Sequence, residues 1–165
     1  MPTPTYTALA NITLGSTASS VSFSSIPSSF RDLVVIIKAG AATGSPNFQL
    51  SLNGDTTNAN YSATQMSGSG SVVDGSAFLT GQSRFINYYG YLETDLHGTY
   101  VVNIMDYSAT DKHKTYLSRA SHADNGVAAV ASRWANTAAV TSVLLTPEGQ
   151  SFASGSTFAL YGIAS

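Results

Sequence analysis

Turn-forming residues interrupt this sequence about every ten to fifteen positions, and the segments between them are too short for amphipathic helices. No long window has apolar residues at i, i+3, i+4 and i+7 with capping residues at its ends. The runs between the turns alternate between apolar and polar residues or are wholly apolar. This pattern is typical of an all-β sandwich or barrel and excludes the helical fold classes.

The apolar runs predict an antiparallel two-sheet β-sandwich that is jelly-roll-like. The run at 33–39 is apolar on both faces, which favours a central strand. The predicted strands cover residues 8–14, 21–23, 33–39, 48–52, 61–65, 85–91, 99–105, 114–123, 127–134, 140–146 and 157–163.

Two short signals predict tight hairpin turns, because Asn and Gly tolerate the positive φ angles that such turns require. Asn53-Gly54 ends one alternating run, and residues 61–65 are its expected return strand. Asp124-Asn125-Gly126 predicts a hairpin between the two strands beside it. The Ser/Gly-rich stretch 67–75 is expected to be an exposed, mobile loop.

The last strand carries apolar residues on both faces, with Phe158 and Leu160 on one and Ala159 and Tyr161 on the other. Such a strand is expected to be buried within a sheet. The predicted core comprises Leu33, Val35, Ile37, Val102, Ile104, Leu144 and Leu160.

Only 10% of the 165 residues are charged, against about 25% in ordinary soluble domains. A free monomer normally keeps charged residues on its surface for solubility. We therefore expect other protein to cover much of this surface; a secreted β-protein with a Ser/Thr-rich face is the alternative. The length fits one domain, and without cysteine its stability depends on packing, hydrogen bonds or assembly.

The net charge is −2, and the seven basic residues are scattered along the sequence. No basic stripe for phosphate groups results, so nucleic-acid binding is not expected. The first residues lack the basic and apolar regions of a signal peptide. The longest apolar run, 33–37, is too short to span a bilayer, so no membrane partner is expected.

Two prolines near the start predict an extended N-terminal arm over residues 1–7, followed by a single sandwich domain over 8–165. Pro2 and Pro4 fix φ and lack an N–H donor, so this segment cannot complete an internal strand. We expect the arm to lie along a neighbouring subunit, with Tyr6 as its anchor.

No catalytic motif is present, since the sequence lacks G-x-S-x-G, H-E-x-x-H and a P-loop. Each histidine has an aspartate two positions away, and on a strand such a pair shares one face and offers two ligands to a divalent metal. Polar decoration of strand ends is the favoured interpretation, so we expect no enzyme activity, metal or cofactor. The pairs are Asp95/His97, Asp111/His113 and His122/Asp124.

The densest aromatic patch comprises Phe85, Tyr88, Tyr89 and Tyr91. Tyrosine is enriched in protein interfaces because its ring is apolar and its hydroxyl polar, and aromatic rings also stack on sugars. Together with Tyr6, these residues are candidate contacts for a subunit interface or a glycan. A place in the core or at an interface is the favoured interpretation.

Three stretches, in the same order, resemble a β-sandwich module of structural proteins of tailed bacteriophages. Residues 20–33, SVSFSSIPSSFRDL, resemble its opening SVTFSSIP followed by Y/F-x-x-L. Residues 50–62 are similar to its hairpin FNGDTGxNY, and residues 152–163 are similar to its ending FxxGSxFxLYGI.

The resemblance implies a structural virion protein without catalytic residues: a capsid decoration or cement protein, a head fibre or a tail appendage. The module stands alone in this chain, which favours a compact knob or cement protein. We expect a homotrimer, since a charge-poor sandwich with small side chains packs closely around a symmetry axis. Its other partner would be the major capsid protein or another virion protein.

The alternative is a carbohydrate-binding module for host recognition, with a host glycan as its partner. In both cases the expected location is the virion, after synthesis in the host cytoplasm.

Overall fold

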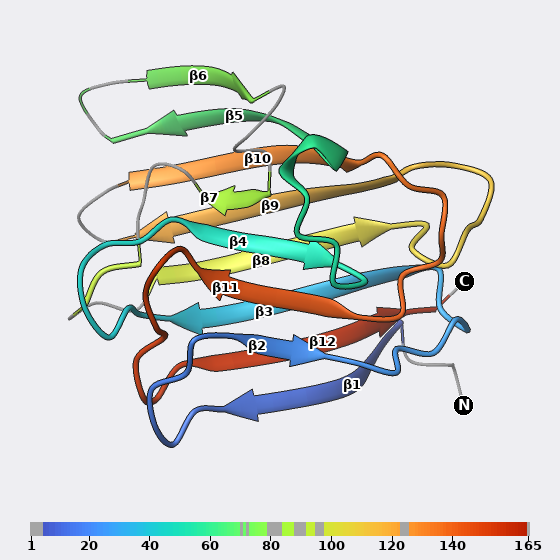
Figure 1. The fold of residues 1–165 in the computed structure, drawn as a ribbon, viewed down its shortest axis with the longest axis horizontal. Coiled ribbons are helices and arrows are strands. Elements are labelled where there is room, and N and C mark those ends of the chain that lie inside the picture. The colour runs from blue at the N-terminus through green and yellow to red at the C-terminus, as the bar shows by residue number, and fades with distance from the viewer. Residues whose placement is uncertain are drawn as a thin grey trace.

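The computed structural model describes residues 5–69, 71, 73–78, 84–87, 92–94, 98–122 and 126–164, which form two antiparallel sheets packed as a sandwich. The smaller sheet overlies the larger in the view of Figure 1. The larger sheet has eight strands in the order β1 (Tyr6–Thr13), β12 (Thr157–Ile163), β3 (Asp32–Ala39), β8 (Gly98–Met105), β9 (Lys114–His122), β10 (Gly126–Trp134), β5 (Tyr61–Gly68) and β6 (Val73–Phe78). The smaller has four, β2 (Val21–Phe23), β11 (Val143–Pro147), β4 (Phe48–Leu52) and β7 (Phe85–Asn87), and the 3₁₀ turn η1 (Asn58–Asn60) precedes β5. The predicted all-β sandwich is confirmed.

The topology is that of one long hairpin rolled up on itself. Its arms pair as β1 with β12, β2 with β11, β3 with β8 and β4 with β7. Rolling then places β12 beside β3 in one sheet and β11 beside β4 in the other. This arrangement of two sheets is a jelly roll.

Two inserted hairpins widen one sheet only. The hairpin β5–β6 follows β4, the hairpin β9–β10 follows β8, and all four strands extend the larger sheet beyond β8. The short strand β7 lies across β9 and β10 from the opposite sheet. The larger sheet is therefore twice as wide as the sheet that covers it.

The core lies between the sheets and is closed by edge-on aromatic contacts. Phe48 of β4 packs against Tyr100 of β8 with ring centroids 5.1 Å apart. Phe152 contacts both Phe48 and Phe158, at 5.3 and 5.0 Å. Such perpendicular pairs stabilise beyond the area that they bury.

Six of the seven predicted core residues are buried, and Leu144 is not. In β11 the side chains of Val143 and Leu145 point into the core, and Leu144 is half-buried on the opposite face. Where three consecutive residues are apolar, the sequence does not show which of the two faces of the strand points into the core. The prediction therefore chose the wrong face of β11.

The Asp124-Asn125-Gly126 signal is confirmed in that β9 and β10 pair throughout as a hairpin, although residues 123–125 themselves lie outside the described part. The predicted loop 67–75 is wrong at both ends. Its first residues belong to β5 and its last to β6, which pair with each other.

The Asn53-Gly54 turn has positive φ angles, 51° and 71°, but the predicted hairpin is wrong. The strands on either side do not pair, because β5 lies in the larger sheet between β10 and β6. The side chain of Asn53 instead donates to the carbonyl of Ala139 and accepts from the backbone N of Thr141, both at 2.8 Å. Contacts with the β10–β11 connection thus direct the chain across to the other sheet.

Asp55 accepts several of the hydrogen bonds that hold the segment between β4 and β5. Its carboxylate accepts from Trp134 Nε1 at 2.8 Å, Asn60 Nδ2 at 2.7 Å and the backbone N of Thr57 at 2.9 Å. The Tyr61 hydroxyl donates to its carbonyl at 2.9 Å. Partial burial raises the pKa of the Asp55 carboxyl, but these hydrogen bonds outweigh burial and hold the pKa below its ordinary value.

The first and third stretches of the phage-like pattern meet in the fold. Gly162 of β12 lies against the ring of Phe30, and a Cβ at this position would be 2.4 Å from Phe30 Cγ. Ser156, just before β12, is fully buried, and its Oγ accepts from the backbone N of Gly40 at 3.3 Å. These residues of the pattern are therefore structural.

The larger sheet begins at Tyr6, two residues before the predicted domain boundary. Tyr6 and Thr7, placed in the arm by the sequence, pair with Ile163 and Gly162 as the start of β1. An edge strand accommodates them, as β1 has only one neighbour. Residues 1–4 of the predicted arm lie outside the described residues.

Replacement of Leu145 by Ala should lower the free energy of unfolding by about 2–5 kcal/mol, because a fully buried leucine leaves a cavity. Leu144→Ala, one position away on the half-buried face, should cost about 1 kcal/mol or less. Urea denaturation of the two variants measures the difference. Equal losses of stability would contradict the assignment of Leu145 to the core and Leu144 to the opposite face of β11.

Acid should destabilise the protein partly through Asp55. Its pKa is lower in the folded chain, so the unfolded chain binds more protons, and stability present above the ordinary pKa of about 3.9 is lost as pH falls below it. Asp55→Asn should be less stable at pH 7 but should lose less between pH 5 and pH 3. Urea midpoints across this range test the effect, and parallel curves would contradict it.

Candidate functional site

The aromatic residues singled out in the sequence do not form one site. Phe85 is 2% exposed, so its ring belongs to the core and does not contact a sugar or a partner, which corrects its place among the candidates. Tyr6 is 57% exposed on β1, at the opposite side of the sandwich from β7. Tyr88, Tyr89 and Tyr91 lie outside the described residues.

The structure points to a different surface, the side of the larger sheet that faces away from the smaller one. We call it the outer face. The pairing of the strands shows which residues lie side by side on this face. Ile36 lies opposite Val101, Val101 opposite Arg119, and Arg119 opposite Ala129. Ala129 in turn lies opposite Met66. This row is apolar except for one arginine.

All the large hydrophobic side chains that are exposed in the described part of the chain lie on the outer face. Their exposed fractions range from 43% to 90%. They are Tyr6, Ile36, Met66, Val73, Met105 and Val127. Isolated exposed apolar residues are ordinary, but their concentration on one face is a feature that interaction surfaces show.

The outer face is large enough for a stable interface. Its eight strands, about 4.8 Å apart and about 25 Å long, give roughly 850 Å². A standard protein interface buries roughly 800 Å² per partner.

Two shallow hollows lie on this surface, and each has an arginine in its wall. One, of about 440 Å³, is lined by Met105, Leu117 and Arg133 among others. The second, of about 520 Å³, includes Met66 and Arg119. Both hollows therefore combine apolar walls with a positive charge.

Three of the seven basic residues project from the outer face: Lys38, Arg119 and Arg133. All three are exposed, and no charged group among them has an ion-pair or hydrogen-bond partner in the described residues. Among the described side chains the one carboxylate on this face is that of Asp32, and it is already bound by Arg31 Nε at 2.8 Å and by the backbone N of Asp106 at 2.9 Å.

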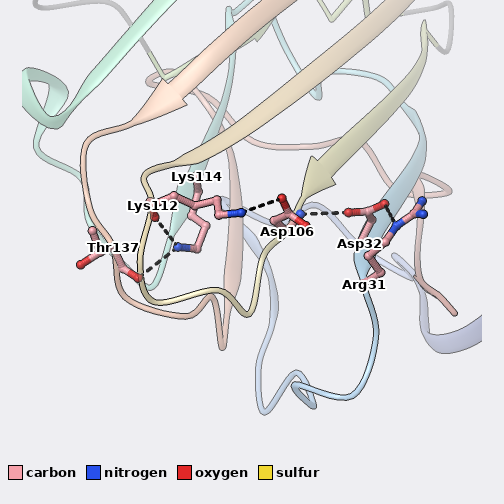
Figure 2. A network of polar contacts seen from close by, with 6 residues as sticks. All are labelled: Arg31, Asp32, Asp106, Lys112, Lys114 and Thr137. Carbon is pink, nitrogen blue, oxygen red and sulfur yellow. Dashed lines mark hydrogen bonds and ion pairs between the residues drawn. The ribbon is translucent and has the colours of Figure 1, made fainter. Parts of the chain in front are cut away.

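The other four basic residues have partners within the described chain. Figure 2 shows the network at one end of the sandwich, where Arg31 binds Asp32 and Lys112 binds Asp106 at 3.3 Å. Arg84 donates to side-chain oxygens at 2.8 and 2.6 Å. The basic residues that have no partner in the described chain therefore all project from the outer face.

Lys114, the fourth, is fully buried and binds no carboxylate. Its Nζ donates to the carbonyls of Lys112 at 2.9 Å and Thr137 at 3.1 Å (Figure 2). Burial lowers the pKa of this amine more than the nearby Asp111 carboxylate raises it. The amine joins the β8–β9 loop to the β10–β11 loop and is closed to a substrate, so its role is structural.

The part of the chain that the structure describes contains no group of three His, Asp, Glu or Cys side chains that could hold a metal. Of the Asp-x-His pairs, Asp111/His113 is described in full, and both residues are exposed on the β8–β9 loop. Asp95, His97 and Asp124 lie outside the described residues, as does the side chain of His122. Within the same limits, no helix is long and apolar enough to cross a membrane.

Comparison with known proteins does not assign the chain to a family. No protein-family model and no curated protein matches it. A crystal structure of a protein of unknown function from Shewanella oneidensis MR-1 is similar over 96% of this chain and 76% of that chain, with 10% identity and a TM-score of 0.26. A likeness this weak carries no argument, so the function has to be argued from the chain itself.

The outer face cannot be recognised in the sequence alone. The basic residues are scattered along the chain, and three of them share a face only because β3, β9 and β10 belong to one sheet. One signal was present in β10, where the outward residues Val127, Ala129 and Ala131 are as apolar as the inward Ala128 and Val130.

Val127→Lys should change the free energy of unfolding by no more than about 0.5 kcal/mol, because its side chain already meets water. Val130→Lys, on the same strand but 1% exposed, should cost at least about 3 kcal/mol by burying an unpaired charge. Thermal and urea denaturation compare the two. A severe loss in Val127→Lys would show that this residue belongs to the core.

Proposed function

We propose that the protein is a structural component of a tailed-bacteriophage virion, a capsid decoration or cement protein or a head-fibre knob, and that it acts by binding protein surfaces. The concentration of exposed hydrophobic side chains on the outer face carries the proposal, because a free surface of this kind is unfavourable in water. The low content of charged residues agrees with it.

The resemblance to the phage module supplies the class of particle. Its three stretches occupy points on which the jelly roll depends, including the Phe30–Gly162 contact and the hydrogen bonds of Asp55. The major capsid protein or another virion protein is the proposed partner, and the protein itself is proposed to assemble as a homotrimer. The carbohydrate-binding alternative depended on segment 85–91, and its one described aromatic side chain, Phe85, is buried.

Purified particles of the phage that encodes this chain should contain it, and particles stripped of the protein should bind it again to saturation. Quantitative mass spectrometry measures the number of copies, and cosedimentation measures rebinding. A host protein of similar charge serves as the control for adsorption. Absence from the particles, together with no rebinding, would contradict the proposed function.

A further inference from the structure

We propose that the outer face binds an acidic, apolar surface of a different protein in the particle, and that its occupant is not a second copy of this chain. The inference rests on the proposed function and names the chemistry of the partner. A homotrimer would then use other surfaces of the sandwich.

The unpartnered cations are the first argument. Four of the seven basic residues have hydrogen-bond or ion-pair partners within the described chain, and the three without one all lie on the outer face. Burial of this face without compensation would leave Lys38, Arg119 and Arg133 desolvated, which is costly. The partner must therefore supply carboxylates.

The two hollows indicate where the carboxylates of the partner would lie, because each hollow has one arginine in its wall. Arg119 borders the hollow that contains Met66, Val73 and Val127, and Arg133 borders the other. An apolar side chain with a carboxylate beside it would fill each hollow and pair with its arginine. Bidentate pairing of this kind gives both energy and register.

A second copy is a poor occupant of this face. Two outer faces in contact would bring six cations together, while the one carboxylate among the described side chains of each face, Asp32, is already bound by Arg31 and a backbone amide. Like charges facing each other across an interface cost several kcal/mol.

A phosphate polymer or lipid surface fits less well than a protein. The strand spacing places Lys38 and Arg119 roughly 12 Å apart, and Arg119 and Arg133 roughly 14 Å apart, with uncharged residues between. A nucleic-acid strand carries a phosphate about every 3.4 Å of its axis, which calls for a continuous basic stripe.

The test measures binding of the full chain to stripped particles with two variants matched in charge. Arg119→Glu should weaken binding at least tenfold, and Lys112→Glu on the β8–β9 loop should change it less than threefold. Arg119→Lys, which keeps the charge but not the bidentate geometry, should lose less binding than Arg119→Glu. Binding of the wild type should weaken between 0.05 and 0.5 M NaCl. If Arg119→Glu fails to fold by circular dichroism, the neutral pair Arg119→Gln with Arg133→Gln replaces it.

Each other outcome overturns the inference in a recognisable way. Wild-type protein that does not bind the particles removes the proposed function as well. Wild-type binding that Arg119→Glu leaves unchanged removes only the inference. Self-association of the wild type, lost in Arg119→Glu during ultracentrifugation, would make a second copy the occupant. Binding to phosphatidylserine vesicles that is lost in the same variant would assign the face to a membrane.

Discussion

Hydrophobic packing between two sheets of unequal width is the constraint on which the rest of the structure depends. Four strands cover the inner face of a sheet of eight, and β7 extends that cover over β9 and β10. An antiparallel sheet in a sandwich usually presents polar residues on the side away from the core. Here the larger sheet also exposes large hydrophobic side chains on its outer face, among polar and basic residues. The smaller sheet covers one face, and the proposed partner would cover the other.

The sequence predicted those features that are local. The bounds of β2 and β12 and the β9–β10 hairpin follow from alternation and turn residues. The sequence did not predict which distant strands pair with each other. Asn53-Gly54 forms its turn, yet its hydrogen bonds to the β10–β11 connection direct β5 into the other sheet. Leu144 shows the limit for phase, because Val143 and Leu145 beside it are equally apolar. The outer face was beyond prediction since it requires the strand order.

The phage-like stretches and the basic residues of the outer face have different roles. The phage-like stretches stabilise the fold, where Gly162 admits the Phe30 ring and Asp55 ties η1 to Trp134. The outer-face cations have no ion-pair or hydrogen-bond partner within the described chain. The contacts of the phage-like stretches therefore account for the architecture.

The rolled hairpin brings the two ends of the sheet-forming chain together. β1 and β12 are neighbours, the carbonyl of Thr5 accepts from the backbone N of Ala164 at 3.0 Å, and β1 starts at the side of the sheet where β12 ends (Figure 1). A short linker between the ends would therefore permit circular permutation, with new termini opened in a surface loop. Likewise, two cargo domains fused one to each end would emerge from a single corner, at the rim of the outer face where Tyr6 and Ile163 pair. The molecule is thus suited to display attached sequences from one point.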